Sequence, residues 1–346
     1  MVASTLTLAS FASIVPAVLA GFDSSAQSNV AVYWGQNSYG QKTSQTRLAD
    51  YCSNDEISII PLAFMNGIKT PITNFANAGD NCTVYAGTQL LNCPQIEEDI
   101  KTCQSKGKTI LLSIGGATYT EGGFSDSASA EAAATDVWNL FGSDTSQANR
   151  PFLSAVVDGF DFDFESTTQN FVPFASKLRS LMDADSSKKY YLSAAPQCVY
   201  PDAAMNDMLN GAISFDFIQV QFYNNYCGVS SFTPGSTTQN NFNFQTWDDW
   251  AKNTSKNKNV KVLIGVPANT GAGGGYVDAS GLAPVIQYAK QFSSFGGVMM
   301  WDMSQLYENS GFLDSVYASL TGSGATKARA ATTLVTKTRP AATQAA

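Results

Sequence analysis

The sequence predicts a single (β/α)8 TIM barrel, an α/β fold of eight parallel strands, as the one catalytic domain over residues 29–320. Eight short apolar or β-branched runs recur along the chain, and helix-like segments lie between several of them. Alternating strands and helices are typical of a parallel sheet, and eight such units in about 300 residues fit a closed barrel. A doubly wound open sheet is the alternative, but no G-x-G-x-x-G fingerprint follows the first run.

The expected strands are short and rich in β-branched, aromatic and other apolar residues, as buried parallel strands are. Helix-like segments between them include SASAEAAATDVWNLFG (127–142) and FVPFASKLRSLMDAD (171–185). The eight strands are, in chain order, NVAVYWG (29–35), ISIIPLAF (57–64), KTILLSIGG (108–116), VVDGFDFDFE (156–165), YYLSAAPQ (190–197), FIQVQFYN (217–224), VKVLIGVPA (260–268) and GGVMMWDM (296–303).

The two ends of the chain differ from this pattern. Residues 1–20 are apolar and rich in small residues, which predicts a secretory signal peptide, and residues 21–28 are expected to lead into the first strand. Ser and Thr interrupt the apolar stretch and no second one follows, so a membrane anchor is disfavoured. From residue 321 to 346 the chain is rich in Ala and Thr, which predicts a disordered tail. The protein is therefore expected to be secreted, either free or associated with a cell wall.

Composition excludes several classes of function. The net charge is −8, which argues against a protein that binds nucleic acid by neutralising phosphates. The chain contains no histidine, so Ser-His-Asp and Cys-His catalysis and His-ligated zinc are excluded. Acid–base chemistry must then fall to carboxylates or to Tyr, Lys or Cys. We expect a monomer without cofactor or metal and with no nucleic-acid or membrane partner.

Six cysteines are consistent with disulfide bonds in an oxidising compartment. None of them has the C-x-x-C spacing of a metal site, and their connectivity does not follow from the sequence. Two N-x-S/T sequons, at Asn81 and Asn253, are compatible with secretion and glycosylation.

The fourth expected strand carries acids in an unusual pattern. Asp161, Asp163 and Glu165 alternate with phenylalanines, so the three carboxyls share one face of the strand and the aromatic rings share the other. In a barrel, such inward-facing acids climb from the core towards the C-terminal mouth, where active sites lie. Like charges this close cannot all ionise easily, so one carboxyl should be protonated at neutral pH, as acid-catalysed bond cleavage requires. Asp158, of opposite parity, begins the strand and needs a separate explanation.

Two other interpretations of this acidic strand stay open. Acids at alternate positions can supply oxygen ligands to calcium, although a rigid strand presents them in a column and not around a point. An inert buried ion network is also conceivable, but no Arg or Lys partner stands out nearby and the desolvation penalty would be large.

These motifs resemble those of the family-18 glycoside hydrolases, the chitinases. DGFDFDFE matches their D-x-x-D-x-D-x-E signature, and SIGG at 113–116 matches S-x-G-G on the third strand. YWGQN from Tyr33, AAPQC from Ala194, QFYNNYC from Gln221 and VMMW ending at Trp301 are similar to the plant-type (class III, hevamine-like) branch, which includes fungal secreted and cell-wall enzymes. The resemblance covers residues 29–320, and several motifs in the same order make a chance match very improbable.

The resemblance implies an endo-acting chitinase that retains configuration by substrate-assisted catalysis. Glu165 would be the general acid, and the substrate's own 2-acetamido oxygen the nucleophile, forming an oxazolinium intermediate. Asp163 would hold the acetamide N–H, Asp161 would share a proton with Asp163, and Tyr223 would donate its hydroxyl to the acetamide oxygen. Three acids are therefore needed and histidine is not.

The resemblance also implies a binding surface for the sugar and a framework around it. Trp301 would lie under the sugar at the cleavage site. Asp158 and Ser113 would be structural, and Gly115 would allow close backbone approach beside the acids. Disulfides Cys52–Cys103, Cys82–Cys93 and Cys198–Cys227 are implied, the last tying the loops after the fifth and sixth strands beside the site. Further lining residues would be Tyr33, Phe64, Gln221, Met299, Ala195 and Gly116.

Two rival functions share this fold. Some relatives have lost the acid and serve as lectins, but Glu165, Asp163 and Tyr223 are all present here. An endo-β-N-acetylglucosaminidase acting on glycoprotein glycans can share the acidic signature, whereas AAPQC and QFYNN favour the chitinase branch.

Overall fold

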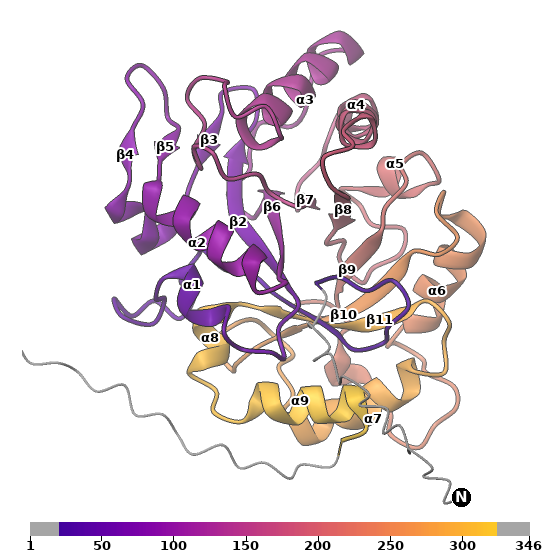
Figure 1. Ribbon diagram of the computed structural model, residues 1–346. Coiled ribbons are helices and arrows are strands. Elements are labelled where there is room, and N and C mark those ends of the chain that lie inside the picture. Colours follow the sequence, from indigo (N-terminus) through magenta and orange to yellow (C-terminus); the bar gives the residue numbers. More distant parts are fainter. Residues whose placement is uncertain (1–20, 324–346) are drawn as a thin grey trace, which may run out of the picture.

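The computed structural model describes residues 21–323, in which eight parallel strands close into a barrel (Figure 1). Each strand pairs with its neighbours in chain order, and β1 pairs with both β2 and β11, which closes the sheet. The predicted (β/α)8 fold is confirmed and the open-sheet alternative is wrong. The barrel strands are β1 (Asn29–Val32), β2 (Ile59–Gly67), β6 (Thr109–Gly115), β7 (Gly159–Asp163), β8 (Tyr191–Ala194), β9 (Phe217–Gln221), β10 (Lys261–Pro267) and β11 (Phe295–Trp301).

Helices surround the strands because each buries an apolar stripe against them (Figure 1). In α4, for example, Phe171, Phe174 and Leu178 recur at helical spacing and are buried. The two predicted helices are found as α3 and α4, whereas α1 and α5 are single turns of four residues. The helices are α1 (Leu48–Tyr51), α2 (Pro94–Ser105), α3 (Ser127–Phe141), α4 (Phe171–Ala184), α5 (Asn206–Leu209), α6 (Phe244–Asp249), α7 (Ala279–Ala289), α8 (Met303–Tyr307) and α9 (Phe312–Thr321), with short turns η1 (Ala76–Asn81), η2 (Val229–Ser231) and η3 (Trp250–Thr254).

The lead-in to the first strand is part of the barrel core. The Phe22 ring lies 4.4 Å from that of Phe217 and 5.3 Å from that of Tyr191, centroid to centroid. The Phe22 main-chain N–H donates to the Thr109 hydroxyl at 2.8 Å. Residues 21–28 thus close the amino end of the barrel, a role that a single aromatic residue in a polar stretch does not reveal in the sequence. The predicted signal peptide and residues 324–346 of the predicted tail lie outside the described residues.

An insertion between the second and third barrel strands was not expected. The short strand β3 (Ile72–Thr73) runs antiparallel to β2, and β4 (Thr83–Val84) pairs with β5 (Leu91–Asn92) in a hairpin that stands away from the barrel (Figure 1). Strands of two residues carry too little periodicity to be read from sequence. No helix within residues 21–323 is long and apolar enough to cross a membrane.

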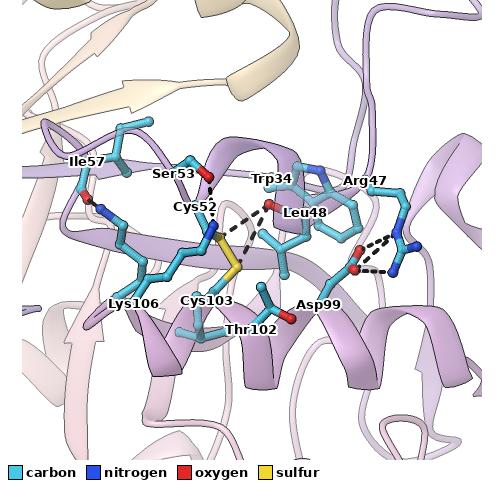
Figure 2. The surroundings of a disulfide bond; sticks show 12 residues. Trp34, Arg47, Leu48, Cys52, Ser53, Ile57, Asp99, Thr102, Cys103 and Lys106 are labelled. Atoms are coloured by element: carbon cyan, nitrogen blue, oxygen red, sulfur yellow. Dashed lines mark hydrogen bonds and ion pairs between the residues drawn. A yellow bond between two sulfur atoms is a disulfide. The ribbon is translucent and has the colours of Figure 1, made fainter.

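All three predicted disulfide pairings are confirmed. Cys52–Cys103 joins the end of α1 to α2, and the Arg47 guanidinium pairs with the Asp99 carboxylate at 2.5 Å beside it (Figure 2). Cys82–Cys93 closes the inserted hairpin. Cys198–Cys227 joins the loops that follow β8 and β9, which are the fifth and sixth barrel strands.

Candidate active site

The three acids of the fourth barrel strand rise from the core to the mouth. Asp161 and Asp163 belong to β7, and their side chains are 0% and 4% exposed. Glu165 lies two residues beyond the end of the strand and is exposed. Phe160 and Phe162 pack on the outside of the sheet, among the helices. The predicted alternation of acids and aromatic rings is therefore confirmed.

Asp161 lies at the centre of a polar cluster inside the barrel. One carboxylate oxygen accepts hydrogen bonds from the Tyr33 hydroxyl at 2.6 Å and the Ser113 hydroxyl at 2.7 Å. The other accepts from the Ser193 hydroxyl at 2.6 Å and the Gln219 amide at 3.0 Å. Burial raises the pKa of Asp161, and these four bonds act in the opposite direction. Four donors on two oxygens match the acceptor capacity of an ionised carboxylate, so this arrangement favours the charged form.

Asp163 has fewer hydrogen-bond donors around it than Asp161 has. Its carboxylate accepts from the Gln221 amide at 3.0 Å. The pKa of Asp163 is raised well above its ordinary value, first by burial and then by the charges of Glu165 and Asp161. Of these acids Asp163 is the one whose environment most favours a proton, as the spacing of like charges predicted.

Glu165 is placed to give up a proton at the mouth. Partial burial of its carboxyl raises its pKa, while the nearby Gln221 amide acts in the opposite direction. Within residues 21–323, neither Glu165 nor Asp163 takes part in an ion pair with a lysine or arginine. A raised pKa without a cationic partner is the condition in which a carboxyl can serve as general acid near neutral pH.

Tyr223 completes the group from the loop after β9. The residue is 6% exposed, and its pKa is raised well above the ordinary value by burial and by the charges of Asp163 and Glu165. Its hydroxyl therefore keeps its proton and can act only as a neutral hydrogen-bond donor or acceptor.

Glycines beside the acids let the third and fourth strands approach closely. A Cβ on Gly115, whose φ is +119°, would lie 2.4 Å from the Asp163 carbonyl oxygen. A Cβ on Gly116, at φ +78°, would lie 2.8 Å from the Phe64 ring. The close backbone approach predicted at Gly115 is confirmed, and Gly116 is equally crowded, since any larger residue would displace Asp163 or Phe64.

An aromatic cluster forms the floor beside the acids. Trp301 stacks on Phe64 with ring centroids 5.8 Å apart and planes 21° apart, and lies 5.5 Å from the Tyr33 ring. Trp301 is partly exposed, whereas Phe64 and Tyr33 are 5% and 1% exposed. The exposed part of Trp301 can meet a ligand, while the hydroxyl of Tyr33 is already engaged by Asp161.

The other residues of the predicted lining lie mainly beneath the surface. Met299 and Ala195 are 1% and 2% exposed and belong to the apolar interior of the barrel. The Gln221 amide bridges the Asp163 carboxylate and the Ala195 carbonyl, at 3.0 Å each. Gln221 therefore holds Asp163, while Met299 and Ala195 fill the apolar interior beside it.

Asp158 has the structural role expected from its parity. Its carboxylate accepts from the Ile110 N–H at 2.8 Å and the Gln104 amide at 3.0 Å, and pairs with the Lys188 ammonium at 2.7 Å. No Arg or Lys partner stood out in the sequence near the acidic strand, but Lys188 is such a partner for Asp158. Lys188 precedes β8, and only the closure of adjacent strands brings it to Asp158.

Sequence reasoning missed Ser193 and Gln219, which hold Asp161 from β8 and β9. Their signal was a polar residue at an inward position of an otherwise apolar strand, the same signal that identified the acids. Among the described residues, no three His, Cys, Asp or Glu side chains converge as metal ligands would.

Comparison with known proteins adds to this geometry. Residues 29–279 match the family described as Glycosyl hydrolases family 18. The chain is 56% identical to "Endochitinase 33" of Trichoderma harzianum over 92% of this chain and 99% of that protein. It is 50% identical to "Class III chitinase" of Arthroderma benhamiae over 88% and 89% of the two chains. The crystal structure of ICChI chitinase from Ipomoea carnea superposes with a TM-score of 0.67 at 27% identity, covering 84% of this chain and 99% of that one.

Proposed function

The chain belongs to the glycosyl hydrolases family 18, and on this basis we propose that it is an endo-acting chitinase that cleaves β-1,4 linkages between N-acetylglucosamine units with retained configuration. The observation that carries the proposal is the convergence of Asp163, Glu165 and Tyr223 on one end of the barrel, beside the partly exposed Trp301. A sugar stacked on the indole would place its reducing-end linkage beside Glu165.

The first chemical step needs one proton and one nucleophile. Glu165 gives its proton to the glycosidic oxygen, and the bond from that oxygen to the anomeric carbon breaks. The carbonyl oxygen of the substrate's acetamido group attacks the same carbon, which yields a cationic oxazolinium ring on the sugar. The Tyr223 hydroxyl donates to the acetamide oxygen and orients it for attack.

Asp163 and Asp161 stabilise the positive charge that this step creates. Asp163 and the Asp161 carboxylate share one proton. As Asp163 accepts a hydrogen bond from the acetamide N–H, this proton moves to Asp161, and the negative charge left on Asp163 stabilises the oxazolinium. The four donors around Asp161 hold its carboxyl group in place below Asp163. In the second step water attacks the anomeric carbon, and its proton goes to the Glu165 carboxylate, which restores the acid.

Secretion is the second part of the proposal. Three disulfide bonds within one chain are typical of an oxidising compartment. The side chains of Asn81 and Asn253 are both exposed, as glycosylation of their sequons requires. Release into the culture medium and a mass shift on treatment with an N-glycosidase would test this part.

Product analysis tests the activity. Digestion of chitohexaose, followed by proton NMR of the anomeric region during the first minutes, should give shorter oligomers with the β-anomer in excess. Excess α-anomer would contradict a retaining mechanism. Binding of chitohexaose without cleavage would indicate a lectin, and release of glycans from a glycoprotein without cleavage of chitohexaose would indicate an endo-β-N-acetylglucosaminidase.

A further inference from the structure

A further buried carboxylate lies in a loop beside the acids of the mouth. Asp202, in the loop after β8, is 4% exposed. Its two oxygens accept three main-chain N–H groups, those of Gln197 and Ala204 at 3.0 Å each and of Met205 at 2.7 Å. Asp202 takes part in no ion pair within the described chain. Burial raises the pKa of Asp202, while the three N–H donors act in the opposite direction and favour the carboxylate form.

The loop that Asp202 organises contacts two segments beside the acids: Gln221 at the end of β9, and the chain that follows Glu165. On one side, the Gln221 N–H donates to the Pro196 carbonyl at 2.8 Å and the Cys198 N–H donates to the Gln221 carbonyl at 3.2 Å. Gln221 is the residue whose amide holds Asp163. On the other side, the Thr168 hydroxyl, three residues after Glu165, donates to the Ala204 carbonyl at 2.5 Å.

The charged and titratable groups around Glu165 come from five parts of the barrel. Asp161 and Asp163 lie on its own strand, Tyr223 follows β9, and Asp202 lies in the loop after β8. Tyr33, after β1, contacts Asp161, and Asp302, after β11, acts on Tyr223. Burial raises the pKa of Glu165 first, and the charge of Asp202 raises it further. For Asp163, burial and the charges of Glu165 and Asp161 raise the pKa more than the charge of Asp202 does. No Lys or Arg acts on Glu165 or Asp163 from any of these elements.

We propose that Asp202 is a positioning residue for the proton-donating step: it fixes the β8 loop between Gln221 and the Glu165 loop, and its fixed negative charge keeps the proton on Glu165. The proposal rests on the proposed function, because it assigns Glu165 as general acid. The carboxylate form of Asp202 is the one that satisfies three N–H donors. Repulsion between two negative charges then disfavours ionisation of Glu165, so the acid stays protonated to a higher pH.

The test compares pH profiles of kcat for chitohexaose in the variants Asp202→Asn, Asp202→Glu and Asp216→Asn. Loss of the charge in Asp202→Asn should let Glu165 ionise at lower pH, which moves the alkaline limb down by roughly 0.3–1 pH unit. Asp202→Glu keeps the charge and should keep the alkaline limb of the wild type. Asp216 is the matched control, since it accepts the Leu192 N–H at 2.9 Å but lies at the amino end of β9.

An Asp202→Asn profile that is lower at every pH, with the alkaline limb unmoved, would overturn the proposal and leave Asp202 a loop anchor. Equal shifts in Asp202→Asn and Asp216→Asn would also overturn it. The titration of Glu165, followed by carboxyl carbon NMR in wild type and Asp202→Asn, needs no turnover. A lower titration midpoint of Glu165 in the variant supports the role of Asp202 even if chitohexaose is not cleaved. Absence of cleavage would contradict only the proposed function.

Discussion

Asp161, Asp163 and Glu165 are spaced two residues apart, yet they differ in what surrounds them. Asp161 accepts from four side chains, Asp163 accepts from Gln221, and Glu165 opens to the mouth. In the proposed mechanism these different surroundings suit Asp161 and Asp163 to share a proton and Glu165 to donate one. The spacing of the acids predicted their column, but not these surroundings, because the donors come from other strands.

At the residue scale, Tyr223→Phe isolates one hydroxyl. The ring stays in place, so the fold and the stacking of the sugar should be unchanged. Loss of the donor to the acetamide oxygen should lower kcat roughly 100-fold, with a small effect on KM. Tyr226→Phe is the matched control, because Tyr226 lies three residues further on and is 66% exposed. A Tyr223→Phe enzyme with the kcat of the wild type would remove Tyr223 from the mechanism.

Asp163→Asn separates activity from stability. The folded state raises the pKa of Asp163, so the protonated side chain contributes favourably to the free energy of unfolding. This contribution is fully present below the unfolded pKa and is lost as pH rises through the folded pKa. The variant should therefore melt at the temperature of the wild type near pH 4 and at a higher temperature at pH 8, while it loses activity. Each kcal/mol gained in the free energy of unfolding raises the melting temperature by about 2–4 °C. Asp158→Asn, which frees Lys188, should lower the melting temperature at both pH values. A destabilised Asp163→Asn at pH 8 would contradict the assignment.

At the scale of elements, alternation within a strand was the most informative pattern. It predicted the inward face of β7, whereas apolar and β-branched runs predicted the eight barrel strands and helix-like segments predicted α3 and α4. The hairpin of β4 and β5 and the one-turn helices α1 and α5 were missed, because elements of two to four residues have no measurable period. Their positions depend on tertiary contacts such as the Cys82–Cys93 and Cys52–Cys103 bridges.

The contact between β6 and β7 predicts the effect of Gly115→Ala. The new methyl group would meet the Asp163 carbonyl oxygen in a backbone conformation that favours glycine. We expect a loss of about 2–4 kcal/mol in the free energy of unfolding and at least about a tenfold loss of kcat, since Asp163 must shift. Gly40→Ala is the control: its φ is +79° with no atom within 4 Å of the added Cβ, so only the backbone strain remains. Equal stabilities of the two variants, measured by urea unfolding, would contradict the close approach.

At the scale of the whole molecule, closure of the barrel creates contacts between residues that are far apart in the sequence. Phe22 fills the amino end among Phe217 and Tyr191, and Lys188 reaches Asp158 only because β7 and β8 are adjacent. The candidate acids could be located because they follow one another along a single strand, and Tyr223 because it lies in a family motif. The supporting residues Ser193, Gln219 and Asp202 could not, since each acts across strands or loops that the sequence does not order in space.

The most direct test of the account is the release of 4-methylumbelliferone from its chitotrioside conjugate between pH 3 and 8, by the wild type and by Glu165→Gln. The wild type should be active on the acid side of neutral and decline as Glu165 loses its proton. Glu165→Gln should lose about a thousandfold in kcat at every pH and still bind chitohexaose. Substantial turnover by Glu165→Gln would contradict the central claim that one carboxyl at the mouth supplies the proton.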